Sequence, residues 1–148
     1  VIVNRKTIQG KPVVQLETAI GSALDCFAGA VGLCVSRDRF MPVKKTEDLL
    51  LVQSNIFNLE EGRLVRNKQR KISSLPVITF GDNLHQVDAF QKCFPAIPDL
   101  LELEMLDIAG QVRFEGPVSL KGEVKLNGNN KPIFIEKGRK IENENIES

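Results

Sequence analysis

The clearest pattern of apolar and polar positions lies in the last third of the chain. Glycine recurs there every six residues, and two apolar columns keep the same spacing. The glycines are Gly110, Gly116, Gly122 and Gly128, one column is Leu106, Val112, Val118 and Val124, and the other is Ile108, Phe114, Leu120 and Leu126. This period is typical of a parallel β-helix, in which each hexad supplies a short strand and glycine eases the corner. An antiparallel meander with glycine turns is the alternative.

Such a β-helix would be short. Roughly four hexads make little more than one coil, and stacked repeats stabilise each other only in larger numbers. We therefore expect this region to pack against the preceding residues and against another subunit. Residues 127–131 are expected to bulge out as a loop, and the polar tail after Gly138 is expected to fray.

Residues 1–54 alternate β-prone runs with helical periodicity, which predicts an α/β architecture. Two extended runs flank a turn at residues 9–12, and a short strand is expected at residues 33–36. Between them, a helix beginning at Thr18 is expected to end at the glycines 29 and 32. Its apolar stripe consists of Ile20, Leu24, Phe27 and Val31. A second helix is predicted from a Thr46 cap to Gln53.

Residues 55–98 continue this pattern. We expect a hairpin over residues 55–66 that turns at Glu61-Gly62, then a polar loop over 67–74 and a strand over 77–80. A helix with Val87, Phe90 and Phe94 on its apolar side should stop at Pro95. Pro95 and Pro98 mark the expected boundary between two domains, residues 1–98 and 99–148.

Composition narrows the class of protein. Hydrophobic residues make up 42% of the chain and charged residues 26%, which is typical of a folded globular protein. A net charge of +1 gives no general case for a nucleic-acid or membrane partner, and no apolar run reaches membrane-spanning length. The three cysteines lack C-x-x-C spacing, which predicts reduced core thiols in a cytoplasmic protein. A start at valine fits a piece of something longer.

Lys44 is the first candidate for chemistry. It precedes a predicted helix N-terminus by two residues, and a lysine at such a place can hold a phosphate. Glu47 and Asp48 in the first helical turn would repel an anion, however. From the residues alone, a solvated surface lysine is the favoured interpretation.

Other polar features suggest no chemistry of their own. His85 has no predicted nucleophile beside it and is expected at the surface. A basic run lacks the interleaved aromatic residues that stack on bases, so a solvated loop is favoured over an RNA-binding segment. The run consists of Arg63, Arg66, Lys68, Arg70 and Lys71. The glycines do not have the spacing of a phosphate-binding loop.

The segment RDRFMPVKKTEDLLL, residues 37–51, resembles RSRFLPVKTTSDLLL of the eukaryotic UDP-glucose pyrophosphorylases. Further blocks match in the family's order and together cover essentially the whole chain: QLETA (15–19), LVQSNIF (51–57), RNK (66–68) and IPDLLELEMLDIAGQVRFEGPVSLKGEVKL (97–126). The chain is identified by this resemblance as the C-terminal portion of a UTP:glucose-1-phosphate uridylyltransferase.

The resemblance implies a fold and a set of site residues. Residues 1–98 would be the C-terminal part of a nucleotidyltransferase domain with a mixed α/β sheet, and residues 99–148 a left-handed, hexapeptide-type β-helix for oligomerisation with a polar tail. Lys44 would be the catalytic lysine that faces the nucleotide phosphates. Arg39, Gln15 and Glu17 are weaker candidates for substrate binding, because Arg39 could merely hold its loop and Glu17 could serve the helix dipole.

The resemblance also implies substrates and partners. UTP and glucose 1-phosphate would react to UDP-glucose and pyrophosphate with Mg²⁺, whose ligands are expected outside this chain. The expected partners are the remainder of the catalytic domain and further copies through the β-helix, without nucleic acid or membrane. The family's glycine-rich loop and its uracil- and sugar-binding motifs lie in its N-terminal half, so residues 1–148 alone are expected to be inactive. The alternative is a stand-alone assembly module.

Overall fold

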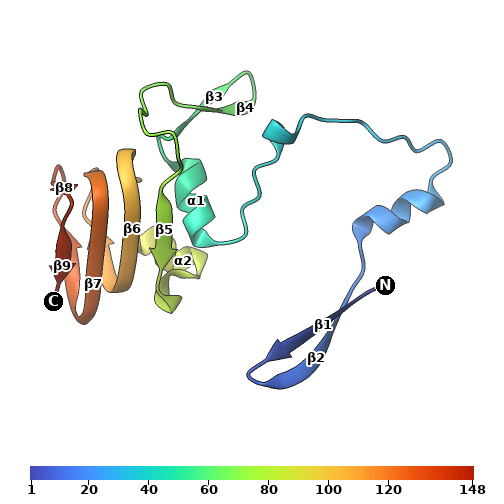
Figure 1. Ribbon diagram of the computed structural model, residues 1–148, viewed down its shortest axis with the longest axis horizontal. Helices are drawn as coiled ribbons and strands as arrows, with labels where there is room; N and C mark the ends of the chain where they lie inside the picture. The colour runs from blue at the N-terminus through green and yellow to red at the C-terminus, as the bar shows by residue number, and fades with distance from the viewer. The chain divides into compact units, whose positions relative to one another are not determined.

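The computed structural model describes the backbone of residues 1–148 and every side chain except those of Ile20 and Asp38. The chain forms two compact units, residues 1–36 and residues 37–148. We call them the N-terminal unit and the C-terminal unit. Figure 1 shows their helices and strands in chain order.

The N-terminal unit contains an antiparallel hairpin of β1 (Ile2–Ile8) and β2 (Lys11–Glu17). Gln9 and Gly10 have φ angles of 50° and 76°, the left-handed pair that a two-residue hairpin turn requires. The turn predicted at residues 9–12 is therefore confirmed.

The helix predicted in this unit is much shorter than expected. A 3₁₀ helix, η1 (Ile20–Cys26), takes its place, and the described backbone of residues 33–36 forms no strand. Leu24, Phe27 and Val31 of the predicted stripe are all exposed. A helix depends mostly on the packing of its apolar face, and this unit offers that stripe nothing to pack on.

The C-terminal unit is organised around a five-stranded sheet. Its strands are β5 (Val77–Phe80), β6 (Asp99–Phe114), β7 (Ser119–Ile135), β8 (Lys140–Glu142) and β9 (Asn145–Glu147). Every strand pair in the sheet is parallel, with β8 and β9 both pairing with β7. The antiparallel alternative is therefore wrong, and most of the sheet is built from residues 99–147.

The six-residue period determines which side chains of the sheet are buried. All eight residues of the two apolar columns lie in the core. Leu106 pairs with Val124 and Ile108 with Leu126, each three hexads further along the chain, whereas beyond the register shift Val112 pairs with Ile133. Gly110, with a φ of 71°, lies opposite Gly128, and a Cβ atom there would meet the Gly128 carbonyl carbon at 2.3 Å. The predicted six-residue period therefore marks buried positions of the parallel sheet.

Two details of this region differ from expectation. Residues 127–131 belong to β7, and the extra residues form a bulge, because the register shifts between the pairs Gly110–Gly128 and Val112–Ile133. The tail after Gly138 is not frayed, because β8 and β9 both pair with β7 in the same sheet and Ile141 is fully buried. In the sequence, Ile141 lies between charged and polar residues, so its neighbours do not indicate that it is buried.

The remaining elements of the C-terminal unit precede the sheet in sequence or connect β5 to β6. They are η2 (Arg37–Arg39), α1 (Thr46–Gln53), the hairpin of β3 (Phe57–Glu60) and β4 (Arg63–Arg66), η3 (Asp82–Leu84) and α2 (Val87–Cys93). The β3–β4 hairpin turns at Glu61-Gly62, and β5 spans the predicted residues 77–80. These elements were therefore predicted correctly.

An aromatic cluster joins α2 to the sheet. The ring of Phe94 lies 5.2 Å from Phe90, 5.8 Å from Phe80 and 4.9 Å from Phe114, measured between centroids. Since β5 also pairs with β6, residues 77–98 share one core with the strands that follow. The predicted boundary at residue 98 lies within the C-terminal unit, and as a division between two functional domains it stays a prediction.

Candidate functional site

Lys44 lies in the segment between η2 and α1, and its side chain is exposed. Its backbone N–H donates to Asp48 Oδ2 at 2.9 Å, and the N–H of Lys45 donates to the same oxygen at 3.0 Å. Lys45 has the extended backbone of a helix cap, with φ −132° and ψ 166°. The start of α1 is therefore capped by the carboxylate of Asp48.

The prediction that Thr46 caps this helix is wrong. Thr46 is the first residue of α1 and only 4% exposed, and its hydroxyl has no hydrogen-bond partner among the described residues. A cap residue needs an extended backbone, and here Lys45 has it. The lysine side chain only donates, so the reciprocal bond that a threonine cap would accept is absent from this helix start.

His85 lies beside the first turn of α1. Its Nε2 is 4.0 Å from Glu47 Oε1, and its Nδ1 is 3.7 Å from Asp82 Oδ1. The side chain of His85 is 46% exposed, as expected for a surface histidine, whereas that of Glu47 is 14% exposed. The histidine thus borders the helix that follows Lys44, a neighbourhood that no local spacing in the sequence reveals.

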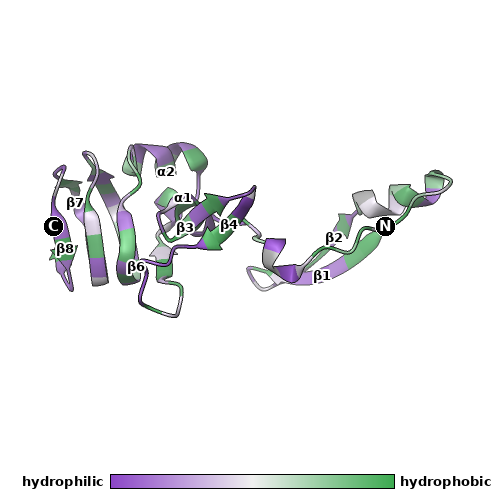
Figure 2. Cartoon of the chain, turned by 90° about the horizontal axis from the view of Figure 1, so that it is seen from above, coloured by the Kyte–Doolittle hydropathy of each residue, from purple (hydrophilic) through white to green (hydrophobic). Residues whose placement is uncertain are grey.

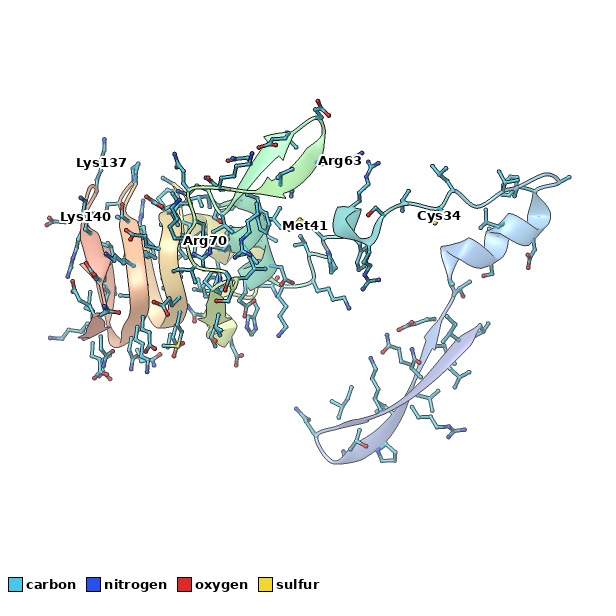
Figure 3. All side chains as sticks on the ribbon, turned by 45° about the horizontal axis from the view of Figure 1, so that its top comes forward. Cys34, Met41, Arg63, Arg70, Lys137 and Lys140 are labelled. Carbon is cyan, nitrogen blue, oxygen red and sulfur yellow. The ribbon has the colours of Figure 1, made fainter. Side chains whose placement is uncertain are left out.

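Arg39 ends η2 and lines a hollow of about 490 Å³ with Met41 and the β3–β4 hairpin. Arg63 and Arg66 of the hairpin line the same hollow, and Figure 3 labels Met41 and Arg63. No acidic side chain lines it among the described residues, so three guanidinium groups make it electropositive. Lys44 does not line this hollow.

Gln15 and Glu17 lie in the N-terminal unit, on exposed positions of β2. Lys6 Nζ donates to Gln15 Oε1, and Gln15 Nε2 donates to Glu17 Oε1 at 2.6 Å. Glu17 ends a strand and is not in the first turn of η1, so the helix-dipole alternative for it is wrong. The structure therefore brings Gln15 and Glu17 together in one unit and places Arg39 and Lys44 in the other.

The prediction from the sequence is wrong for Arg70. The basic run was expected to form a solvated loop, yet Arg70 is 6% exposed. Its guanidinium donates to the carbonyl oxygens of Ser74, Leu100, Leu101 and Leu103 over 2.8–3.2 Å, and Figure 3 shows it within the body of the C-terminal unit. Burial, aided by the charge of Arg66, lowers the pKa of Arg70. Arg70 ties the loop after β4 to the start of β6, and no signal in the sequence separates it from its exposed neighbours.

The described residues do not fit a magnesium site of their own. No group of three or more histidine, cysteine, aspartate or glutamate side chains is arranged among them to hold a metal ion. None of the described helices is both long and apolar enough to cross a membrane.

Comparison with solved structures defines the class of protein. A Leishmania major UDP-glucose pyrophosphorylase mutant in complex with UDP-glucose matches with a TM-score of 0.73 and 28% identity, over 99% of this chain and 32% of that one. A Trypanosoma brucei structure described as a UDP-glucose phosphorylase matches with a TM-score of 0.71 and 32% identity, over 99% of this chain and 34% of that one. The fold is that of the UDP-glucose pyrophosphorylases, which are nucleotidyltransferases.

Sequence comparison defines the family. The family described as "UTP--glucose-1-phosphate uridylyltransferase" matches residues 1–121. UTP--glucose-1-phosphate uridylyltransferase 2 of Dictyostelium discoideum is 42% identical over 144 residues, which are 97% of this chain and 29% of that protein. The enzyme of that name from Pyrus pyrifolia is 44% identical over 126 residues, 85% of this chain and 27% of that protein. The chain belongs to the UTP--glucose-1-phosphate uridylyltransferase family and spans less than a third of the length of these relatives.

Proposed function

We propose that residues 1–148 act as the Lys44-bearing and C-terminal part of a UTP:glucose-1-phosphate uridylyltransferase, which forms UDP-glucose and pyrophosphate from UTP and glucose 1-phosphate. The observation that carries this proposal is the family match over residues 1–121, which includes the Lys44 segment. The assembly module without catalytic activity is not favoured, because the matched relatives bear the name of the enzyme. The remainder of the catalytic domain would supply the other substrate-binding residues.

The proposed role of Lys44 is electrostatic. In uridylyl transfer, a phosphate oxygen of glucose 1-phosphate attacks the α-phosphorus of UTP and pyrophosphate leaves, so negative charge must be stabilised around the transferred group. The exposed Lys44 side chain is free to reach a nucleotide, while its backbone is held at the start of α1. Removing one preorganised contact of this kind costs about 10²–10³ in rate.

The other candidates have supporting roles in the proposal. Arg39 would contact an anionic group of a substrate from its electropositive hollow. Gln15 and Glu17 would orient the site through the hydrogen bond between their side chains. Magnesium would compensate phosphate charge when bound. Its ligands would come from outside these residues. A cytoplasmic location is part of the proposal and rests on the sequence alone.

The test is Lys44→Ala in the full-length protein, with Lys45→Ala as the matched control. We expect Lys44→Ala to lower kcat for UDP-glucose formation at least about 100-fold, because the cation is lost while the fold stays intact. Lys45→Ala removes a neighbouring exposed ammonium and should keep kcat within about threefold, well below the loss expected at Lys44. A Lys44→Ala variant with the rate of the unmodified enzyme would remove Lys44 from the mechanism.

For residues 99–148 we propose a left-handed β-helix that joins copies of the protein. Support comes from the parallel pairing of β6 with β7, which falls at three-hexad intervals from Leu106 to Gly110, and from the edges of the short strands β8 and β9 at the end of the sheet. Unpaired strand edges favour association with a further chain. Sedimentation velocity over a range of concentrations decides this point, and a species that stays monomeric throughout contradicts it.

A further inference from the structure

The backbone around Lys44 is held by one carboxylate. Among residues 41–45, the described structure shows hydrogen bonds from only two N–H groups, those of Lys44 and Lys45. Both donate to Asp48 Oδ2, at 2.9 and 3.0 Å. Bonds from an N–H to a carboxylate are stronger than those between neutral groups. Asp48 therefore accepts both hydrogen bonds that the described N–H groups of this segment donate, and the Lys45 carbonyl accepts one more from the Leu49 N–H at 3.1 Å.

Asp48 is itself fixed by the core of the C-terminal unit. It lies in α1 two residues after Thr46 and two before Leu50, which are 4% and 0% exposed. Leu49 and Leu51 also pack partly against the core, and Ser54 Oγ donates to the Leu51 carbonyl at 2.8 Å at the end of the helix. A continuous path of packed residues and hydrogen bonds thus runs from the core through Asp48 to the backbone of Lys44.

This restraint matters because a lysine side chain is long and flexible. A change in the backbone dihedral angles of Lys44 displaces its ammonium group. A productive site tolerates a displacement of only about 0.5 Å. A misplacement of about 1 Å can cost a factor of about 100 in rate. Holding the base of Lys44 therefore narrows the volume that the ammonium samples before substrate binds.

We propose that Asp48 is a positioning residue for uridylyl transfer, which acts by fixing the backbone of Lys44 and Lys45 through its carboxylate oxygen. The inference rests on the proposed function of Lys44. Glu47 does not share this role, since its carboxylate faces His85 and not the preceding backbone.

The experiment compares Asp48→Ala and Asp48→Asn in the full-length protein, with Asp88→Ala as the control. Asp88 occupies the first turn of α2, where no side chain makes a cap hydrogen bond, so its removal changes the same helix-dipole charge without freeing a backbone segment. We expect Asp48→Ala to lower kcat about 10- to 100-fold with KM for glucose 1-phosphate within about twofold. Asp48→Asn keeps an oxygen that can accept both bonds and should recover most of kcat. Asp88→Ala should leave kcat unchanged.

A double substitution separates positioning from general loss of structure. If Asp48 acts through Lys44, Asp48→Ala should lower kcat no further once Lys44 is alanine, because the two residues then act as one unit. Full additivity of the two losses, a wild-type kcat for Asp48→Ala, or Asp48→Asn as slow as Asp48→Ala would each overturn the inference. If Lys44→Ala itself kept a normal rate, the proposed function of Lys44 would fail instead, whatever the Asp48 variants did.

Discussion

The two units of the chain have similar local sequence patterns, but their apolar residues differ in burial. Both contain a hairpin with a left-handed two-residue turn and apolar residues at regular spacing, and Figure 2 shows hydrophobic stretches in each. In the C-terminal unit the apolar columns are buried, and Leu106 is 0% exposed. In the N-terminal unit Phe27 is 66% and Val31 92% exposed, and none of the described core residues comes from this unit.

This difference shows that the spacing of apolar residues predicts which face of a helix or strand is apolar. It does not predict which other part of the protein packs against that face. The apolar residues of the C-terminal unit pack against later strands of the same unit, because β6 and β7 pair in parallel. The described residues of the N-terminal unit form a two-stranded sheet and a short 3₁₀ helix, which are too little to cover an apolar face. Its apolar residues are therefore left exposed within this unit.

The sharpest test of this contrast pairs two phenylalanines. Phe114→Ala should lower the free energy of unfolding by about 3–5 kcal/mol, since it leaves a cavity beside Phe94 in the core. Phe27→Ala, in the N-terminal unit, should change it by less than about 0.5 kcal/mol. Urea unfolding followed by circular dichroism measures both, as the chain has no tryptophan or tyrosine to report by fluorescence. Equal losses would contradict the contrast.

Two glycines with the same backbone conformation give the next largest effect. Gly110 and Gly10 have φ angles of 71° and 76°, but an added Cβ meets Gly128 backbone at 2.3 Å in one and nothing within 4 Å in the other. Gly110→Ala should therefore lower the free energy of unfolding by about 3 kcal/mol, which is the sum of conformational strain and overpacking. Gly10→Ala should show the strain alone, about 1 kcal/mol, in a measurement of hairpin amide exchange. Similar costs at both sites would mean that the strands of the sheet are not closely stacked at Gly110.

The cysteines give a smaller effect that depends on pH. Burial raises the pKa of the Cys93 thiol from 9.0 to about 12, whereas Cys26 and Cys34 are exposed. The folded state holds the Cys93 proton more tightly than the unfolded state, so this contribution to stability is complete below pH 9 and is lost as pH rises towards 12. We expect unfolding free energy to fall over this range, and to fall less steeply in Cys93→Ala.

Labelling with a thiol reagent at pH 8 provides the matching comparison. Cys26 and Cys34 should react readily, and Cys93 should react only after unfolding, because the reactive form is the thiolate. Rapid labelling of Cys93 in the folded chain would contradict its burial.

Much of the fold could be predicted from local signals. The turns at Gln9-Gly10 and Glu61-Gly62, the strand at 77–80 and the apolar columns follow from residue preferences over a few positions, and the structure confirms them. The burial of Ile141 and Arg70 could not be predicted, because each depends on a strand or loop distant in sequence. The helix expected at residues 18–32 was wrong since its stripe lacks a surface to pack on.

The candidate site was predictable only in part. The resemblance of residues 37–51 to the family's segment singled out Lys44, and the acids of the following helical turn were visible in the sequence. That Asp48, and not Thr46, holds the start of the helix depends on the extended backbone at Lys45. The assignment of a catalytic role to Lys44 stays a prediction.

The sequence by itself determined the family and the six-residue period and singled out Lys44 as the candidate, because these are properties of residue order. Only the tertiary structure decided that the period stacks in parallel and that the tail joins the sheet. It alone showed that one aspartate restrains the backbone of Lys44. The physical reason is that hydrogen bonds between strands and burial in a core are made by residues far apart along the chain, whose meeting no local preference specifies.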